Sequence, residues 1–273
     1  MPPTRIARMF DGLKQQGRKG LIGYLTAGDP SPDRTPALVE ALVRGGADLI
    51  ELGVPFSDPI ADGPVIQRAG ERALAAGTSL KAVLAIAREI RERSQVPLLL
   101  FTYLNPLLRY GLERLAEDAA ASGVDGCLLT DASVEEAHAY VDAMHRHGLD
   151  TVFLAAPTST ERRLKLVAQY STGFVYLVSR TGVTGERDSL SGQVGPLVRS
   201  MRAVTSLPLA VGFGISRPEH VAEVGGYADA AVVGSALVDL IARESGSPQL
   251  VDRVDAYVRS LRAACQPRTA GAR

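Results

Sequence analysis

Short apolar runs alternate with helix-period segments along the whole chain, and this alternation constrains the fold more than any other feature. The runs occur at residues 21–25, 49–52, 97–103, 126–129, 151–154, 174–178, 208–212 and 230–233. They do not alternate apolar with polar residues, as a half-exposed antiparallel strand would. Each run therefore predicts a parallel strand that is buried on both faces.

Amphipathic segments separate these runs. Apolar or small residues at i, i+3, i+4 and i+7 spacing predict helices that turn one face inward. They are Leu38, Ala41, Leu42 and Gly45, then Leu164, Val167 and Ala168, then Leu197, Met201 and Val204, and finally Val251, Val254, Val258 and Leu261. A further helix is expected from Thr4 to about Gln15, ahead of the first strand.

A glycine followed closely by an aspartate precedes three of the predicted strands. Gly46, Gly123 and Gly226 each stand shortly before an aspartate and an apolar run, and each is expected to end a helix in the left-handed conformation. This recurrence indicates a repeated βα unit. Eight units in 273 residues fit an α/β fold of the (β/α)8 TIM barrel type with an extra N-terminal helix, and a doubly wound open sheet is the alternative.

No linker rich in Ser or Pro divides the chain. Residues 1–265 are therefore expected to form a single barrel domain, followed by a disordered tail at 266–273. Thirty basic residues balance thirty acidic ones, which disfavours nucleic-acid binding. Two cysteines, and no apolar stretch long enough for a signal peptide or a bilayer span, favour a cytoplasmic protein.

The active site of such a barrel lies at the carboxyl ends of the strands. The polar residues and glycines expected there are Tyr24, Thr26, Asp29, Glu51, Asp58, Asp62, Tyr103, Asn105, Asp131, the segment 179–192, Gly212, Gly214, Gly234 and Ser235. Glu51 is the most unusual, because it lies within a strand whose side chains should face the barrel interior. Burial should raise its pKa toward the range of a general acid or base. The alternative is an ion pair between Glu51 and a helix.

Asp62 follows in a loop that Pro59, Gly63 and Pro64 make stiff. It is either a second functional carboxylate or the N-cap of a helix that begins near Pro64. One buried carboxylate and one on a rigid loop would together suit proton transfer between two substrate atoms.

Glycines after the last two strands indicate an anion site. Gly212 and Gly214 follow the seventh run, and Gly234 and Ser235 follow the eighth, where barrels often bind phosphate. Tight turns are the alternative explanation. The polar segment 179–192 is expected to be a lid, and no metal site is expected because the spacing of the histidines is unsuitable.

Four motifs, at residues 25–30, 51–67, 179–185 and 212–216, resemble the tryptophan synthase alpha chain family from the first strand to the last. The second motif, Glu-Leu-Gly-Val-Pro-Phe-Ser-Asp-Pro-Ile-Ala-Asp-Gly-Pro-Val-Ile-Gln, is long and specific. The resemblance implies a lyase that splits indole-3-glycerol phosphate into indole and glyceraldehyde 3-phosphate by a retro-aldol reaction. It implies no cofactor in this chain.

The resemblance also implies roles for individual residues. Glu51 would be the acid/base, Asp62 would accept the indole N–H, and Thr184 on the lid would contact Asp62. Tyr24, Phe101 and Tyr176 would line the indole pocket, with Tyr103 near the reacting centre. Gly185, Phe213, Gly214, Gly234 and Ser235 would hold the phosphate.

A partner follows from the same resemblance: a beta chain that carries pyridoxal phosphate, in a heterotetramer of two alpha and two beta chains. The segment at Asp58 and Pro59 and the loop after the fourth strand would contact it. Here the chain departs from the family, because Ala132 and Ser133 follow Asp131 where a proline is frequent. Two alternatives remain: a free-standing lyase that releases indole, and a non-catalytic regulatory barrel that binds a phosphate ester.

Overall fold

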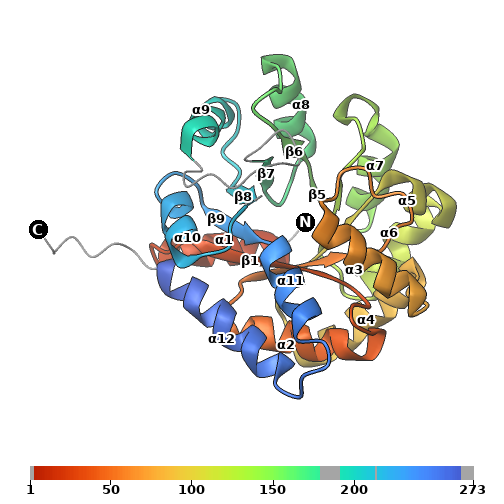
Figure 1. The fold of residues 1–273 in the computed structure, drawn as a ribbon. Helices are drawn as coiled ribbons and strands as arrows, with labels where there is room; N and C mark the ends of the chain where they lie inside the picture. The colour runs from red at the N-terminus through yellow and green to blue at the C-terminus, as the bar shows by residue number, and fades with distance from the viewer. Residues whose placement is uncertain (1–2, 179–190, 213, 266–273) are drawn as a thin grey trace, which may run out of the picture.

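A single parallel sheet forms the centre of the computed structural model, which describes residues 3–178, 191–212 and 214–265 (Figure 1). The strand order is β5-β4-β3-β2-β1-β9-β8-β7-β6, and every ladder is parallel. The strands are β1 (Gly20–Thr26), β2 (Leu49–Gly53), β3 (Leu98–Thr102), β4 (Gly126–Leu129), β5 (Asp150–Val152), β6 (Leu154–Ala155), β7 (Val175–Val178), β8 (Leu209–Gly212) and β9 (Ala230–Val233). Each predicted run contains a strand, as expected.

The fifth run is the one that differs from expectation, because it is split at Phe153 into β5 and β6. β5 pairs with β4, whereas β6 pairs with β7. The Phe153 amide instead donates to the Ser171 hydroxyl at 3.3 Å. Because β5 and β6 are the two ends of the strand order and follow one another in the chain, this split closes the sheet into the expected (β/α)8 barrel. An open doubly wound sheet is excluded.

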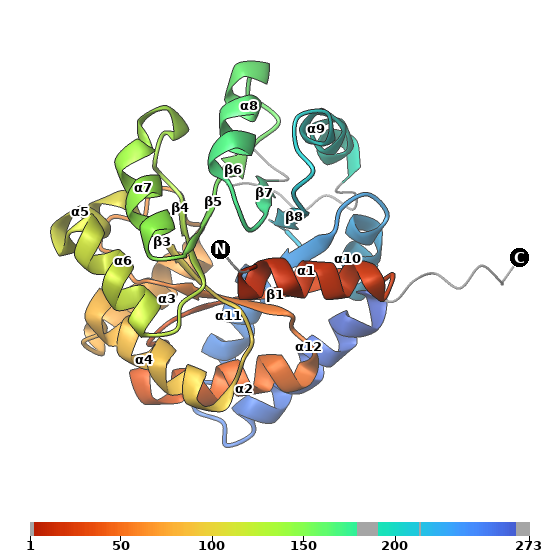
Figure 2. The same cartoon turned by 180° about the vertical axis from the view of Figure 1, so that it is seen from behind.

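Helices surround the sheet on its outer side, and the first helix lies across one of its ends (Figures 1 and 2). They are α1 (Arg5–Gln15), α2 (Thr35–Gly45), α3 (Pro64–Ala75), α4 (Leu80–Arg93), α5 (Leu104–Tyr110), α6 (Leu112–Ala121), α7 (His138–Arg146), α8 (Glu161–Tyr170), α9 (Ser191–Arg202), α10 (Pro218–Gly225), α11 (Ser235–Arg243) and α12 (Leu250–Arg262). α9 begins at Ser191, inside the segment 179–192 that is expected to be a lid. None of the described helices is long and apolar enough to cross a bilayer.

The expected N-terminal helix is present as α1, and it lies across one end of the barrel (Figure 2). Its buried residues Ile6, Phe10 and Leu13 pack in one cluster with inward-facing side chains such as Ile22 on β1 and Leu49 on β2. Burying this apolar face holds the helix against the strands. The helix therefore closes the barrel at the end where the strands begin and leaves the other end for a site.

The glycines before the strands behave in two ways. Gly46 and Gly123 adopt the predicted left-handed conformation, with φ of +103° and +77°. The prediction is wrong for Gly226, whose φ is −70°. One more residue separates Gly226 from its aspartate than in the other two connections. The amides of Tyr227 and Ala228 continue the helical turn by donating to Val224, so no left-handed residue is needed.

Candidate active site

Glu51 lies on β2 and faces the barrel interior. Leu49, two residues earlier, belongs to the inner cluster, so Glu51 shares its face of the strand. The residue is 1% exposed, and neither carboxyl oxygen has a hydrogen-bond partner among the described residues. Burial raises the pKa of Glu51 to about 8. The alternative of an ion pair with a helix is therefore wrong, because no described cation reaches this group.

Asp62 lies in the irregular segment between β2 and α3 and is half-buried. Burial raises its pKa to about 6, and a side-chain hydrogen bond with Tyr103 opposes that shift. The N-cap of α3 is Gly63, which makes no side-chain capping bond. The alternative that Asp62 caps this helix is therefore wrong, and its carboxyl group is available for other contacts.

Tyr24 lies within the electrostatic influence of both carboxyl groups. It lies opposite Glu51 in the register of β1 and β2. Burial raises the pKa of its hydroxyl, and so do the negative charges of Asp62 and Glu51. Since both charges act on one buried hydroxyl, both carboxyl groups lie near the carboxyl end of β1.

Aromatic rings from three strands adjoin this acidic pair. The rings of Tyr24 on β1 and Phe101 on β3 meet edge to face, with centroids 5.2 Å apart. Phe101 in turn meets Tyr176 on β7 at 6.4 Å. The charge of Glu51 also raises the pKa of Tyr176, so this ring lies close to the buried carboxyl group. The three rings form an apolar wall beside Glu51, suited to a flat ring system.

Two glycines leave the space that the tyrosine side chains occupy, a role that the sequence did not lead us to predict. A Cβ at Gly53 would lie 2.2 Å from the Tyr24 hydroxyl oxygen, and a Cβ at Gly212 would lie 2.0 Å from that of Tyr176. Each tyrosine therefore lies over a glycine of the neighbouring strand. A glycine within a strand is a general signal of such a close approach, and it could have identified Gly53.

The glycines assigned to an anion site lie at the ends of two neighbouring strands, β8 and β9. Gly214 has a φ of +80°. Gly234 precedes α11, which begins at Ser235 and has no side-chain cap, so amides of its first turn remain open to a ligand. The carbon atoms of Tyr24 lie at least 3.6 Å from a Cβ at Gly234, which connects this end of β9 to the aromatic wall. Thr184, Gly185 and Phe213 lie outside the described residues.

Three other polar residues at the strand ends, Asp29, Asp131 and Thr26, have structural partners. Asp29 accepts two hydrogen bonds from Arg72, both at 2.8 Å. Asp131 accepts the Leu104 amide at 2.8 Å, and Thr26 lies 3.3 Å from the Tyr24 hydroxyl. These residues shape the loops around the acidic pair.

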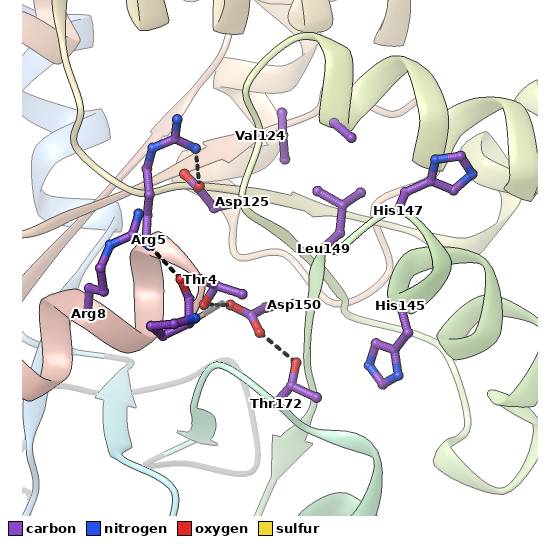
Figure 3. A pocket seen from close by; sticks show the side chains of 13 residues that line it. Thr4, Arg5, Arg8, Val124, Asp125, His145, His147, Leu149, Asp150 and Thr172 are labelled. Carbon is purple, nitrogen blue, oxygen red and sulfur yellow. Dashed lines mark hydrogen bonds and ion pairs between the residues drawn. The ribbon is translucent and has the colours of Figure 1, made fainter. Parts of the chain in front are cut away.

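A second pocket, of about 580 Å³, lies at the opposite end of the barrel beside α1 (Figure 3). Its charged groups are already bound within the protein. Arg5 pairs with Asp125 at 2.9 Å, and Asp150 accepts hydrogen bonds from Thr4 at 2.5 Å and Thr172 at 2.8 Å. These contacts attach α1 to the barrel, which is the stabilising role expected of this face.

Metal ligation finds no support in the described part of the chain. It contains no group of three or more His, Cys, Asp or Glu residues that could hold a metal ion. His145, which lines the second pocket, contacts the Thr151 hydroxyl at 3.2 Å, and His138 contacts Tyr170. These histidines have local structural partners.

The fold and the acidic pair define a class: a (β/α)8-barrel enzyme with its functional side chains at the carboxyl ends of the strands. Over residues 10–266 the chain matches the model of the family described as Tryptophan synthase alpha chain. The chain belongs to the tryptophan synthase alpha chain family.

Individual relatives agree with this family. The tryptophan synthase alpha chain of Solibacter usitatus is 73% identical over 259 residues, which cover 95% of this chain and 97% of the relative. That of Geobacter sulfurreducens is 50% identical over 261 residues, covering 96% and 98%. A chain of Mycobacterium tuberculosis tryptophan synthase superposes with a TM-score of 0.89 at 38% identity, covering 97% of this chain and 99% of that one. Tryptophan synthase subunit alpha of Legionella pneumophila gives a TM-score of 0.87 at 38% identity, covering 96% and 98%.

Proposed function

We propose that Glu51 and Asp62 perform the proton chemistry of the reaction of this family, the cleavage of indole-3-glycerol phosphate into indole and glyceraldehyde 3-phosphate. The observation that carries this proposal is the buried carboxyl group of Glu51, which has no hydrogen-bond partner among the described residues, together with a second carboxyl group, that of Asp62, which acts on the same tyrosine, Tyr24. Between about pH 6 and pH 8, Asp62 is ionised while Glu51 keeps its proton. The pair thus offers one acid and one base at neutral pH.

Glu51 serves first as the acid and then as the base. Its proton passes to C3 of the indole ring, which turns the ring into a leaving group. The Glu51 carboxylate then takes the proton of the glycerol hydroxyl as the carbon–carbon bond breaks and the aldehyde forms. The hydroxyl proton replaces the one that Glu51 gave, so the enzyme returns to its starting state.

Asp62 acts on the other side of the ring. Its carboxylate accepts the indole N–H and stabilises the positive charge that builds up on the ring after protonation of C3. A charge held in place in this way contributes on the order of 3 kcal/mol to transition-state stabilisation, about a hundredfold in rate. Tyr103 holds the Asp62 side chain through its hydrogen bond.

The remaining residues bind and enclose the substrate. Tyr24, Phe101 and Tyr176 contact the indole ring through the aromatic wall described above. Amides at Gly214, Gly234 and Ser235 bind the phosphate, supported by the uncapped start of α11. Gly185, Phe213 and Thr184, which the family resemblance assigns to the phosphate site and to a contact with Asp62, lie outside the described residues.

The chain works with a beta chain in a heterotetramer of two alpha and two beta chains, and the beta chain carries the pyridoxal phosphate. The contact surface includes Asp58 and Pro59 and the segment 130–133. The apolar side chain of Ile60, next to Pro59, is 84% exposed, which supports this assignment.

Two further properties belong to the proposal. Residues 1–265 act as one domain, since the described strands share one sheet. The setting is the reducing cytoplasm, since Cys127 and Cys265 are buried as free thiols.

Replacing Glu51 by glutamine (Glu51→Gln) tests the proposal. The glutamine side chain has the same shape but cannot transfer a proton, so indole release should fall by at least about a thousandfold while substrate affinity stays within a few-fold. Steady-state indole release and calorimetric binding measure the two effects. Parental indole release with unchanged binding would overturn the role of Glu51.

A further inference from the structure

The backbone of Asp62 is held by side chains and carbonyl groups outside regular structure. Its amide donates to the Pro59 carbonyl at 3.1 Å. Its own carbonyl accepts the side-chain amide of Gln67 at 2.8 Å. The amide of the preceding residue, Ala61, donates to the Tyr103 hydroxyl at 3.1 Å. Tyr103 thus contacts both the backbone before Asp62 and the Asp62 carboxyl group.

Gln67 lies in the first turn of α3 and bonds back to the loop twice. Its backbone amide donates to the Gly63 carbonyl at 3.0 Å, and its side chain reaches Asp62. No side chain caps α3. The amide of Gln67 is therefore the side-chain contact that joins the start of this helix to the residue proposed to stabilise the indole charge.

α3 is itself fixed to the barrel. Arg72, further along the helix, binds both oxygens of Asp29, which is 2% exposed and lies just after β1. Ala69 and Ala73 are fully buried. A bidentate ion pair with a buried carboxylate has a defined geometry, so it fixes the position of α3 relative to the end of β1. The position of Gln67 is thereby tied to the same strand that carries Tyr24.

We propose that Gln67 is a positioning residue for Asp62: its side-chain amide holds the Asp62 carbonyl group and so keeps the carboxyl group within reach of the Tyr103 hydroxyl. The inference rests on the proposed function of Asp62 and deepens it. Gln67 touches the backbone of Asp62 and acts on the reaction through it.

Loss of this contact has a specific electrostatic consequence. The hydrogen bond from Tyr103 lowers the pKa of Asp62 against the effect of burial. A loop free to rotate away from Tyr103 loses that bond, and the pKa of Asp62 rises. The described titratable groups around this site are Tyr103 after β3, Tyr24 on β1 and Glu51 on β2. None of these three groups carries a positive charge that could stabilise the Asp62 carboxylate in place of the Tyr103 hydroxyl.

The test is Gln67→Met, which keeps the length of the side chain and its helix propensity but removes the donor. Arg68→Met is the matched control, because Arg68 is the next residue of α3 and is exposed. We expect the acid limb of kcat/KM against pH to move to higher pH in Gln67→Met, with about a tenfold loss of kcat/KM at pH 6. Arg68→Met should match the parent protein.

Three further measurements make each outcome decisive. A lower melting temperature for Gln67→Met with an unmoved acid limb would overturn the proposal, since that is the signature of a merely structural residue. If Gln67→Met does not fold, Gln67→Leu, which also lacks the donor and adds no charge, takes its place. Asp62→Asn tests the underlying function separately: an acid limb that persists in this variant shows that Asp62 does not produce it, whatever Gln67 does.

Discussion

The carboxyl group of Glu51 on β2 and that of Asp62 in the loop after β2 owe their different acidities to their surroundings. Glu51 is enclosed by strands and has no hydrogen-bond donor among the described residues, so burial acts on it unopposed. Asp62 is half-buried, and Tyr103 donates to it. The chain thus keeps one carboxyl group neutral and the other ionised at the same pH.

The unpartnered Glu51 should also lower the stability of the fold. Its pKa is about 8 in the folded chain, against 4.5 as its ordinary value. Between these values the folded state binds more protons than the unfolded state, so stability falls as the pH rises. Glu51→Gln removes that dependence. We expect the variant to gain little stability near pH 5 and a few kcal/mol near pH 8, about 1.4 kcal/mol for each unit of pKa difference.

Thermal unfolding of both proteins across this pH range checks the prediction. The gain in melting temperature should grow steadily toward alkaline pH. A constant difference would contradict it, because a constant difference would mean that Glu51 titrates alike in the folded and unfolded chains.

The carboxyl ends of the strands carry the candidate active site, and contacts at the amino ends of the strands hold the barrel together. Asp48, Asp125 and Asp229, which follow the helix-ending glycines, each accept a backbone amide at the start of a neighbouring strand, at 2.8–2.9 Å. Each also pairs with an arginine. The repeated glycine–aspartate pattern in the sequence is therefore a structural device.

The start of α11 provides a test of the phosphate site. A valine at position 234 would place carbon atoms where a ligand should approach the backbone, while its Cβ would make only ordinary contacts, 3.6 Å from Tyr24. We expect Gly234→Val to fold and to bind glycerol 3-phosphate at least about tenfold more weakly, a loss of about 1.4 kcal/mol.

Isothermal calorimetry measures this affinity. Gly246→Val, in the open loop that follows α11, is the matched control, since a Cβ there meets nothing within 4 Å. Equal affinities in the two variants would refute an anion site at Gly234.

The barrel as a unit has two different ends. α1 closes one end, and Thr4 fixes it by accepting the Ala7 amide and donating to Asp150. The acidic pair lies at the other end, and so does the exposed side chain of Ile60, two residues before Asp62. A partner that docks there can act directly on the loop that carries Asp62.

Addition of a purified beta chain of this family tests that coupling. We expect the rate of indole release to rise by about fivefold or more, which is within the usual range of coupling between sites. Glu51→Gln with the beta chain present controls for contaminating activity. Unchanged turnover on addition of the beta chain would favour a free-standing lyase.

Most of the fold could be predicted from the sequence, because buried parallel strands and amphipathic helices each leave a local period in the chain. Glu51 can also be recognised from the local sequence, because a charged residue within an apolar run is unusual whatever the run packs against. Of the predicted features that failed, the left-handed Gly226 depended on one more residue in its connection, and the unbroken fifth strand depended on the different neighbours with which its two halves pair.

The contacts around Asp62 and the tyrosines could not be predicted in this way. Gly53 makes room for Tyr24 because β1 and β2 pair in one register, and Tyr103 reaches Ala61 across 42 positions of sequence. Such contacts depend on strand register and loop path, which no local pattern encodes. The sequence therefore specifies a barrel with an acid at a strand end, and three-dimensional packing alone selects which neighbours set the protonation of its carboxyl groups.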